Sequence, residues 1–355
     1  MEVAIFGAGV AGLTSAITLH AQGCRCRVFE RTRLSHEAGM GFILMPEGIA
    51  CLESFGVRLA GVPLAGYQAR DASGRVLHQQ AMPAGSRSMR RRELIACLMR
   101  ALPPESAPAF EVELEALEFD GAGRVAAARM SSGEHVRADL YVAADGIHSR
   151  ARETLFPDWP ATDAQVLEVV GISGAEEVMR WAGRDFNKFH AAGGGVALGV
   201  LPVNPAHVVW FVQFDAHRFP PPQESAESRH AFVEKMVGGW AEPVPAMLAA
   251  TDFSGVYVWR PVDTDLLPHF HHGNLVLVGD AAHPLSPFTS QGVSSAIADA
   301  VALAQAVTQP DLLQALAAYT RQRRQQCAPY VAQGRELVQR FLAPLNDNVV
   351  LPIAK

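Results

Sequence analysis

The first thirty residues contain the feature that most restricts the fold of this chain. Residues 3–23 read VAIFGAGVAGLTSAITLHAQG: an apolar run typical of a buried strand, three glycines spaced G-x-G-x-x-G, and apolar residues at helical spacing. Gly23 marks a helix end, and a second strand-like segment, CRVFE, ends at Glu30. This succession predicts a β-α-β unit with the glycines at its first turn.

Each glycine of this motif has a physical role in binding a dinucleotide. Gly7 permits the tight turn out of the strand, Gly9 lets a pyrophosphate approach the backbone, and Gly12 lets the helix pack closely against the sheet. The positive end of the helix dipole suits phosphate oxygens. Glu30 stands where a carboxylate accepts the hydroxyls of an adenosine ribose, and it would repel a 2′-phosphate.

Two further strand-like segments end in an aspartate. After a predicted three-stranded antiparallel meander over 112–138, the buried segment 140–143 leads to Asp145 in the pair DG, and 275–278 leads to Asp280 in the pair GD. Loops that follow parallel strands gather at one edge of a sheet, so we expect both beside the glycine-rich turn. A carboxylate there can bind a polyol such as the ribityl chain of a flavin, or alternatively cap a helix.

Composition narrows the classes of protein and partner. The net charge of −6 over 355 residues and the pI near 6.1 give no reason to expect nucleic acid or an anionic membrane surface. No segment is long and apolar enough to predict a membrane span. The five cysteines predict reduced thiols and a cytoplasmic protein, and no metal site is expected.

The three motifs together resemble a known family. GAGVAG with Glu30, DGIHSRAR at 145–152 and GDAAHPLSPFTSQG at 279–292 are similar to the fingerprints of FAD-dependent aromatic hydroxylases. These are the single-component, p-hydroxybenzoate-hydroxylase-like flavoprotein monooxygenases. The resemblance covers nearly the whole chain, and its motifs occur in the family's order.

The resemblance implies an α/β fold with two domains. A Rossmann-like FAD-binding domain is expected over 1–155 and 266–355, with helices at its C-terminal end. A mixed or antiparallel β-sheet is expected as an inserted substrate domain over 156–265, to which part of 60–90 contributes.

The resemblance also implies contacts to the cofactor. Glu30 would hold the adenosine ribose, Asp145 would serve both FAD and NAD(P)H with Ser149 and Arg152 as supports, and Asp280 would hold the ribityl chain. Backbone N–H groups of Gly292 and Val293 would face the flavin pyrimidine, and Arg91 would contact the cofactor. The expected FAD-binding residues are Gly7, Gly9, Val10, Ala11, Gly12, Glu30, Arg31, Gly41, Arg91, Asp145, Asp280, Gly292 and Val293.

One loop departs from the family's pattern. It reads SQGVS at residues 290–294, where the family usually reads G-Q-G-x-N. Ser294 is expected to cap the following helix, which is predicted to run to about Val307. The positive end of this helix would stabilise the anionic reduced flavin.

The implied activity is that of an NAD(P)H-dependent FAD monooxygenase. Such an enzyme inserts one oxygen atom from O2 into an aromatic or planar small molecule through a flavin C4a-hydroperoxide. No second dinucleotide fingerprint exists, so NADH or NADPH is expected to bind transiently. An FAD-dependent reductase, an epoxidase or a Baeyer–Villiger-type oxygenase of the same fold, and a flavin-binding regulatory module, are the alternatives.

Substrate contacts are expected from the middle of the chain and from the Pro287 loop. No catalytic acid or base is assigned, and Pro287 is expected nearest the reacting substrate. In the apolar strand 210–214, Gln213 shares one face with Phe211, and either face could cover the flavin. The substrate candidates are Tyr67, His190, Gln213 and Pro287.

Overall fold

The strand expected at the amino terminus lies inside a six-stranded sheet. In the computed structural model, which describes residues 1–33 and 41–345, its order is β20-β21-β12-β1-β2-β8. β1 pairs in parallel with β2 and β12, and β12 pairs in parallel with β21, so the carboxyl ends of these strands lie at one edge. The strands are β1 (Glu2–Phe6), β2 (Arg25–Glu30), β8 (Ala109–Phe110), β12 (Leu140–Ala143), β20 (His271–His272) and β21 (Leu275–Leu277).

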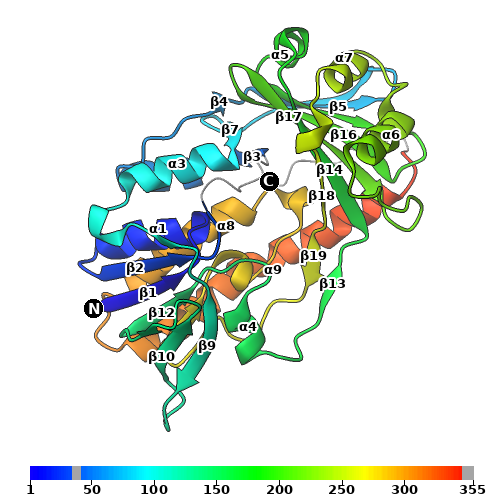
Figure 1. Cartoon of the computed structure of the whole chain (residues 1–355). Helices are drawn as coiled ribbons and strands as arrows, with labels where there is room; N and C mark the ends of the chain where they lie inside the picture. Colours follow the sequence, from blue (N-terminus) through cyan, green and yellow to red (C-terminus); the bar gives the residue numbers. More distant parts are fainter. Residues whose placement is uncertain (34–40, 346–355) are drawn as a thin grey trace.

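Helices cover one face of this sheet, and a three-stranded antiparallel sheet lies beside its other face (Figure 1). α1 packs against both α3 and α8, and α8 packs against α9. The meander predicted over 112–138 is confirmed as β9, β10 and β11. These elements are α1 (Val10–His20), α3 (Arg91–Ala101), α4 (Arg150–Leu155), α8 (Gly292–Ala306), α9 (Leu312–Leu342), β9 (Leu114–Phe119), β10 (Val125–Met130) and β11 (His135–Val136).

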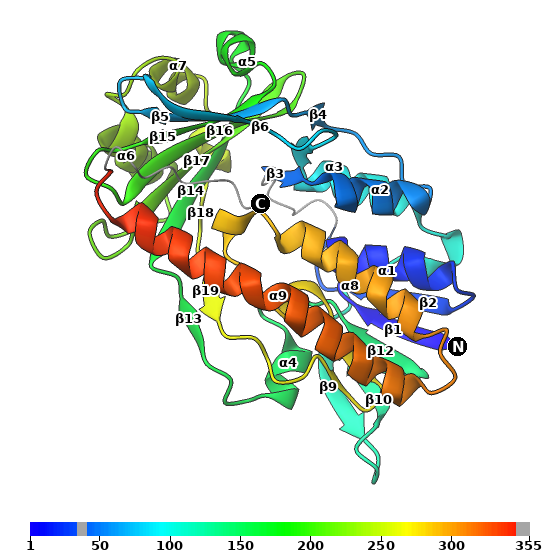
Figure 2. The ribbon, with the colours of Figure 1, turned by 180° about the vertical axis from the view of Figure 1, so that it is seen from behind.

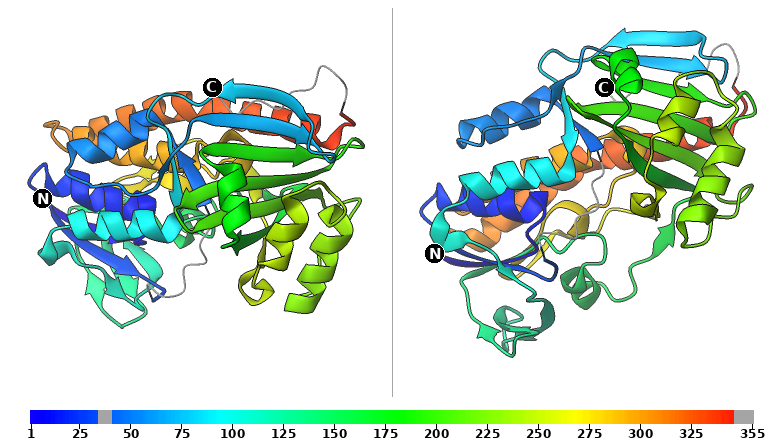
Figure 3. Two further views of the ribbon diagram at one scale, coloured as in Figure 1. Left: turned by 90° about the horizontal axis from the view of Figure 1, so that it is seen from above. Right: turned by 45° about the horizontal axis from the view of Figure 1, so that its top comes forward.

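A second, seven-stranded sheet has the order β18-β14-β17-β16-β15-β5-β6. All its pairings are antiparallel except that of β15 with β5, so the sheet is mixed. Figure 3 shows β5 and β6, in light blue, at its edge. The strands are β5 (Gly66–Asp71), β6 (Val76–Ala81), β14 (Val166–Ser173), β15 (Asp185–His190), β16 (Val196–Asn204), β17 (His207–Asp215) and β18 (Tyr257–Trp259).

The two faces of the seven-stranded sheet have different coverings. Trp210, Val212 and Phe214 are buried in an apolar core with three helices, α5 (Glu176–Ala182), α6 (Ala226–Val237) and α7 (Val244–Ala249). The alternate residues of the same strand lie on the opposite face, where Val209 packs with Ile43. We call this second face the cleft face, because it looks toward the six-stranded sheet (Figure 1).

A three-stranded sheet, a two-stranded sheet, a short helix and one long helix join the two large sheets. β3 (Gly41–Leu44) pairs with β7 (Arg87–Arg90), which also pairs with β4 (Val62–Pro63), and α2 (Pro46–Ser54) follows β3. The linking strands β13 (Ala161–Asp163) and β19 (Val262–Thr264) pair with each other. Figure 2 shows α9 crossing the back of the molecule from the six-stranded sheet to the seven-stranded one.

The α/β class, the Rossmann-like sheet and the C-terminal helices are confirmed. The far end of α9 packs Leu337 and Phe341 against Val166 and Ala197 of the cleft face. No helix of the described residues is long and apolar enough to cross a membrane.

The packing of α8 gives a first test of this arrangement. Leu303 is fully buried between the helices, whereas Leu313 at the start of α9 is 45% exposed. We expect Leu303→Ala to lower the free energy of unfolding by about 2–5 kcal/mol, because it removes buried methyl groups and leaves a cavity. Leu313→Ala should change it by no more than about 0.5 kcal/mol in the same urea titration. Equal effects of the two variants would contradict the packing.

Candidate active site in the cleft between the two sheets

Three loops meet at the carboxyl edge of the six-stranded sheet. Phe6, Ala143 and Leu277 are register neighbours at the ends of β1, β12 and β21. The glycine-rich turn, the Asp145 loop and the Asp280 loop therefore leave the sheet side by side, as the sequence predicted. This edge faces the seven-stranded sheet (Figure 1).

In the glycine-rich turn, Gly7 is required by its backbone conformation and close packing, and Gly9 leaves the start of α1 open. Gly7 has φ +103°, and a Cβ there would lie 2.2 Å from the carbonyl oxygen of Ala144. Gly9 precedes α1 and offers no side-chain cap, so the N–H groups of the first helical turn remain available to a ligand. A free helix N-terminus beside bare backbone suits an anionic group.

Glu30 lies against this turn. Its Oε2 accepts a hydrogen bond from the backbone N–H of Ala8 at 2.8 Å, and its Oε1 accepts one from the N–H of Thr32 at 2.9 Å. The Thr32 hydroxyl also donates to Oε1, at 2.8 Å, so these bonds fix the carboxylate at the end of β2 and leave a further lone pair on Oε2. The neighbouring Arg31 is exposed.

Arg91 brings a positive charge to the same turn. It is the first residue of α3, and its Nη2 would lie 3.4 Å from a Cβ built on Gly9. Gly41 has a different environment, because a Cβ there would come within 2.9 Å of Val203 on the seven-stranded sheet. The close approach that requires glycine at position 41 is thus to a neighbouring strand.

The Asp145 loop is tied to the Asp280 loop through Arg152. The Arg152 Nη1 donates to the carbonyl oxygens of Asp280, at 3.0 Å, and Ala281, at 3.3 Å, and its Nη2 donates to that of Ile147. Ser149 caps α4 by accepting from the N–H of Arg152. Arg152 therefore supports the backbone of both loops.

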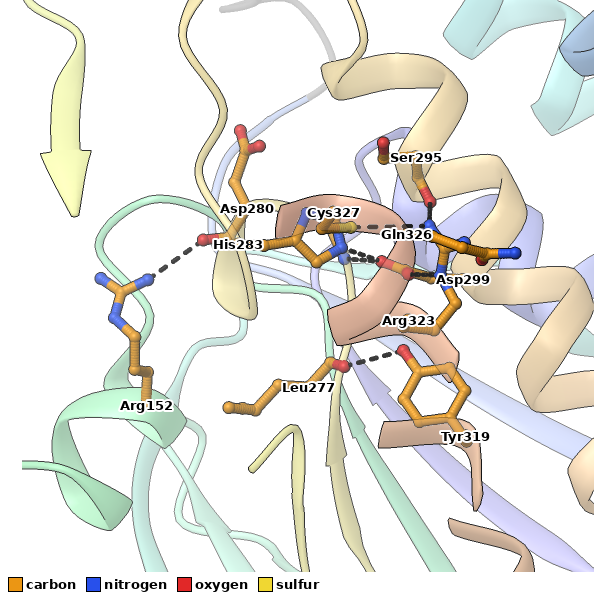
Figure 4. A network of polar contacts seen from close by, with 11 residues as sticks. Arg152, Leu277, Asp280, His283, Ser295, Asp299, Tyr319, Arg323, Gln326 and Cys327 are labelled. Atoms are coloured by element: carbon orange, nitrogen blue, oxygen red, sulfur yellow. Dashed lines mark hydrogen bonds and ion pairs between the residues drawn. The ribbon is translucent and has the colours of Figure 1, made fainter. Parts of the chain in front are cut away.

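Asp145 and Asp280 present their carboxylates differently. Asp145 accepts from the N–H of Ala151 at 3.3 Å, its other oxygen has no partner among the described residues, and burial raises its pKa. Asp280 is exposed and its carboxylate points away from His283 (Figure 4), although desolvation by the surrounding protein raises its pKa as well. Of the two, Asp280 is the carboxylate that is open to a ligand.

A buried ionic network holds the Asp280 loop from behind. Asp299 of α8 accepts from the His283 Nε2 at 2.6 Å, from the Arg323 Nε of α9 at 2.6 Å, and from the backbone N–H of Gly279 at 2.7 Å (Figure 4). Arg323 also donates to the carbonyl oxygen of Ser295 at 3.1 Å. Each of the three charged side chains is at most 5% exposed.

The network is ionised at neutral pH. Burial disfavours the charged forms, but the attraction between the partners outweighs it. The Asp299 carboxylate raises the pKa of His283 well above 6.5, and His283 and Arg323 together lower the pKa of Asp299. The sequence analysis missed this network, and its only local signal was the histidine that follows GDAA.

The loop before α8 differs from the prediction at one serine. α8 begins at Gly292 after Gln291, so Ser294 lies inside the helix, and the prediction that it caps the helix was wrong. Ser290 has φ +53°, a left-handed conformation that turns the chain into α8 two residues earlier than expected. No side-chain cap occupies the helix start, so the N–H groups of Gly292 and Val293 remain free for a ligand.

The cleft face carries three of the four substrate candidates. Tyr67 is buried on β5 with its ring 5.4 Å from that of Phe186, and His190 is buried near the end of β15. Gln213 is buried beside Phe211, on the face opposite the helix-covered core, and its Nε2 donates to the Oε1 of Glu168 at 2.7 Å. The cleft face is therefore the face that Gln213 shares with Phe211.

The fourth candidate, Pro287, is on the other side of the site, in the loop before α8. It begins a helical turn, Pro287–Thr289. It lines a cavity of about 420 Å³ between the loop, β19 and α9, which also touches Val166 at the edge of the cleft face. The next residue, Phe288, lies 4.9 Å from the ammonium group of Lys188 on β15. The sequence analysis passed over Lys188 and its neighbour Glu168, although each is a charged residue inside an apolar strand.

Comparison with known proteins identifies the class. The model of a family described as FAD binding domain matches residues 1–333, so the chain belongs to that family. It is an FAD-dependent monooxygenase. The 3-amino-4-hydroxybenzoate 2-monooxygenase of Streptomyces cremeus is 29% identical over 331 residues, which cover 85% of this chain and 77% of that protein.

Further relatives agree with this class. The FAD-dependent urate hydroxylase of Klebsiella pneumoniae is 28% identical over 353 residues, covering 95% of this chain and 89% of that protein. Among solved structures, Klebsiella pneumoniae HpxO complexed with FAD and uric acid superposes with a TM-score of 0.85 at 24% identity, covering 96% of this chain and 89% of the other. The 2,6-dihydroxypyridine-3-hydroxylase from Arthrobacter nicotinovorans gives 0.85 at 20% identity, covering 99% and 96%.

The buried network makes the fold depend on one carboxylate. We expect Asp299→Asn to lower the free energy of unfolding by about 3–5 kcal/mol, because it leaves a buried arginine without its counter-charge. The exposed Asp158 makes no hydrogen bond or ion pair with the described residues, and Asp158→Asn should stay within about 0.5 kcal/mol of the parent. Urea unfolding of both variants at neutral pH measures the difference, and a mild effect at Asp299 would contradict the network.

His283 makes the free energy of unfolding depend on pH in a direction that its raised pKa determines. Because the pKa of His283 is higher in the folded protein, its contribution is complete below the unfolded pKa and is lost as the pH rises toward the folded one. The stability difference between the parent and His283→Gln should thus fall by up to about 1.4 kcal/mol per pH unit above roughly pH 6.5. Unfolding curves at about pH 6 and about pH 8.5 test this. A constant difference would mean that His283 is neutral in the fold.

Proposed function

We propose that this protein is an NAD(P)H-dependent FAD monooxygenase that inserts one oxygen atom of O2 into an aromatic or similarly planar small molecule. The observation that carries the proposal is the meeting of the glycine-rich turn, the Asp145 loop and the Asp280 loop opposite the cleft face. The named activities of the relatives, on an aminohydroxybenzoate and on urate, support a planar substrate.

The residues at the cleft fit FAD along its length. The free N–H groups of α1 and the Arg91 guanidinium would hold the pyrophosphate, and Glu30 would accept the adenosine hydroxyls. The exposed carboxylate of Asp280 would accept the ribityl hydroxyls. The uncapped start of α8 would donate N–H groups of Gly292 and Val293 to the pyrimidine edge.

When bound, the flavin would take a hydride from NADH or NADPH and activate O2 at its C4a position. This chain's residues position and shield the reacting groups. The N-terminus of α8 places partial positive charge where the reduced ring is anionic. Phe211, with Tyr67, His190 and Gln213, would close the cleft from the side of the seven-stranded sheet, and Pro287 would form the opposing wall.

The thiols support the expected cytoplasmic location. All five cysteines are free, and four of them, Cys24, Cys26, Cys97 and Cys327, are buried. Burial raises the pKa of the Cys26 thiol to about 12 and so keeps it protonated and unreactive. Reduced thiols in the core agree with a reducing compartment.

The direct experiment follows three quantities in one sealed reaction. The purified holoenzyme is mixed with NADH or NADPH and a panel of aromatic acids, phenols, indoles and quinolones. Substrate-stimulated oxidation of the reductant, O2 uptake and a product one oxygen atom heavier would support the proposal. Oxidation of the reductant without O2 uptake would instead indicate a reductase.

Asp280 provides a test of the cofactor site. We expect Asp280→Ala to lose FAD on gel filtration, because each charged hydrogen bond to the ribityl chain contributes about 1.5–3 kcal/mol. Asp252→Ala is the matched control, because Asp252 caps the helical turn Phe253–Gly255, which belongs to none of the three loops of the site. The ratio of flavin absorbance to protein absorbance measures occupancy. Equal occupancy in both variants would remove Asp280 from the site.

Gln213 provides a test of the substrate side. We expect Gln213→Leu to weaken productive substrate binding by about 1–3 kcal/mol, because it also leaves a Glu168 oxygen without its donor. FAD content should not change, whereas hydrogen peroxide should replace part of the product. Gln223→Leu, an exposed position of the same region, is the control. Unchanged coupling and KM in Gln213→Leu would exclude Gln213 from the substrate pocket.

A further inference from the structure

Four polar side chains gather on the cleft face among apolar neighbours. They come from four strands of the seven-stranded sheet: Gln213 from β17, Glu168 from β14 and Tyr257 from β18, which are consecutive in the sheet, and Lys188 from β15, which β16 separates from β17. Glu168 is the register partner of Gln213, and Lys188 and Tyr257 lie in one row across the sheet with Phe211. We call these four residues the polar cluster.

The polar cluster is buried and only partly satisfied. Glu168, Lys188 and Gln213 are 5%, 8% and 2% exposed. The Gln213 Oε1 and the Tyr257 hydroxyl are buried without a hydrogen-bond partner among the described residues. Lys188 faces the ring of Phe288 at 4.9 Å, but it makes no direct ion pair with Glu168. Native proteins leave few buried polar atoms unpaired, so this concentration beside the cleft calls for a ligand.

The surface next to the polar cluster is aromatic, with the rings of Phe186 and Phe211 tilted by 41° to each other. The ring of Phe211 lies over Gly199 of the neighbouring strand, where a Cβ would come within 2.2 Å of it. The ring of Phe186 follows at 6.1 Å from that of Phe211. A planar ring system can pack on this surface with its polar edge toward the cluster.

The polar cluster contains one acid, Glu168, and one base, Lys188. Burial raises the pKa of Glu168 to about 7 and lowers that of Lys188 to about 8, while their mutual attraction opposes both shifts. Between these two pKa values Glu168 is ionised and Lys188 is protonated, so their charges cancel. Burial also lowers the pKa of the adjacent His190 to about 3, so His190 is neutral. A carboxylate placed here would introduce an uncompensated buried charge, which a neutral ligand avoids.

We propose that the polar cluster selects a neutral planar heteroaromatic substrate whose edge carries an N–H donor next to a carbonyl acceptor, as in a lactam, and disfavours aromatic carboxylates. The lactam N–H would donate to Glu168 or to the Gln213 Oε1, and its carbonyl would accept from Lys188 or Tyr257. This inference rests on the proposed function, because it names the substrate class of the same cleft.

The test compares two ligands that share one bicyclic ring. 2-Quinolone carries the lactam edge, and quinoline-2-carboxylate carries an anionic one. Equilibrium dialysis of the holoenzyme against each gives its Kd without turnover. The expected result is binding of the lactam at least about tenfold more tightly than the acid. Equal affinities, a preference for the acid, or binding of neither ligand would overturn the inference.

Two substitutions then change the charge of the polar cluster in opposite directions. Glu168→Gln leaves Lys188 without a nearby acid, so affinity for the acid should rise about tenfold or more while that for the lactam falls. Lys188→Met leaves Glu168 alone, so binding of the acid should be lost. Because Glu168→Gln is expected to gain an affinity, a damaged fold cannot imitate its result.

Glu234→Gln and Lys235→Met are matched controls, since both residues are exposed on α6. Neither control should alter either Kd. A Glu168→Gln variant with normal FAD content and unchanged preference would overturn the inference, while reductant-dependent hydroxylation by the parent would keep the proposed function. If the parent prefers the lactam but never consumes O2, the proposed function fails and the assignment of the polar cluster stands.

Discussion

One buried carboxylate joins the parts of the protein that shape the cofactor cleft. Asp299 belongs to α8, yet it accepts hydrogen bonds from the backbone of the Asp280 loop and from the α9 arginine, Arg323. The loop, α8 and the long helix α9 across the back are therefore fixed to a single group. The cost of burying these charges is offset because His283 and Arg323 each pair with Asp299, although the His283 Nδ1 has no hydrogen-bond partner among the described residues.

This arrangement also fixes where the loops lie relative to the seven-stranded sheet. Arg152 extends the support to the Asp145 loop, because it donates to the carbonyl oxygens of Asp280 and Ala281. The side chain of Asp280 remains free because only its backbone is used for support. α9 then continues to the seven-stranded sheet, where Leu337 and Phe341 pack on the cleft face. One helix thus sets the distance between the loops and the sheet that closes over them.

The amino-terminal unit and the meander could be predicted because their signals are local. A glycine motif between a strand and a helix, and strands separated by glycine turns, depend on neighbours in sequence. The start of α8 was missed because the left-handed Ser290 is not favoured by its residue type. The Asp299 network was missed because its members are joined across different elements, and no periodicity links them. Glu168 and Lys188 were overlooked for the same reason, since only the folding of β14 and β15 into one sheet places them on the same face.

The domain boundaries and the individual cofactor and substrate contacts stay predictions, and the chemistry of oxygen is the claim on which the account depends. The most direct measurement is the fate of isotopically labelled O2 during turnover with NADH or NADPH and a planar substrate. One labelled atom should appear in the product and the other in water, both detected by mass spectrometry. Product oxygen derived from the solvent, or a product with no added oxygen while reductant is consumed, would contradict it.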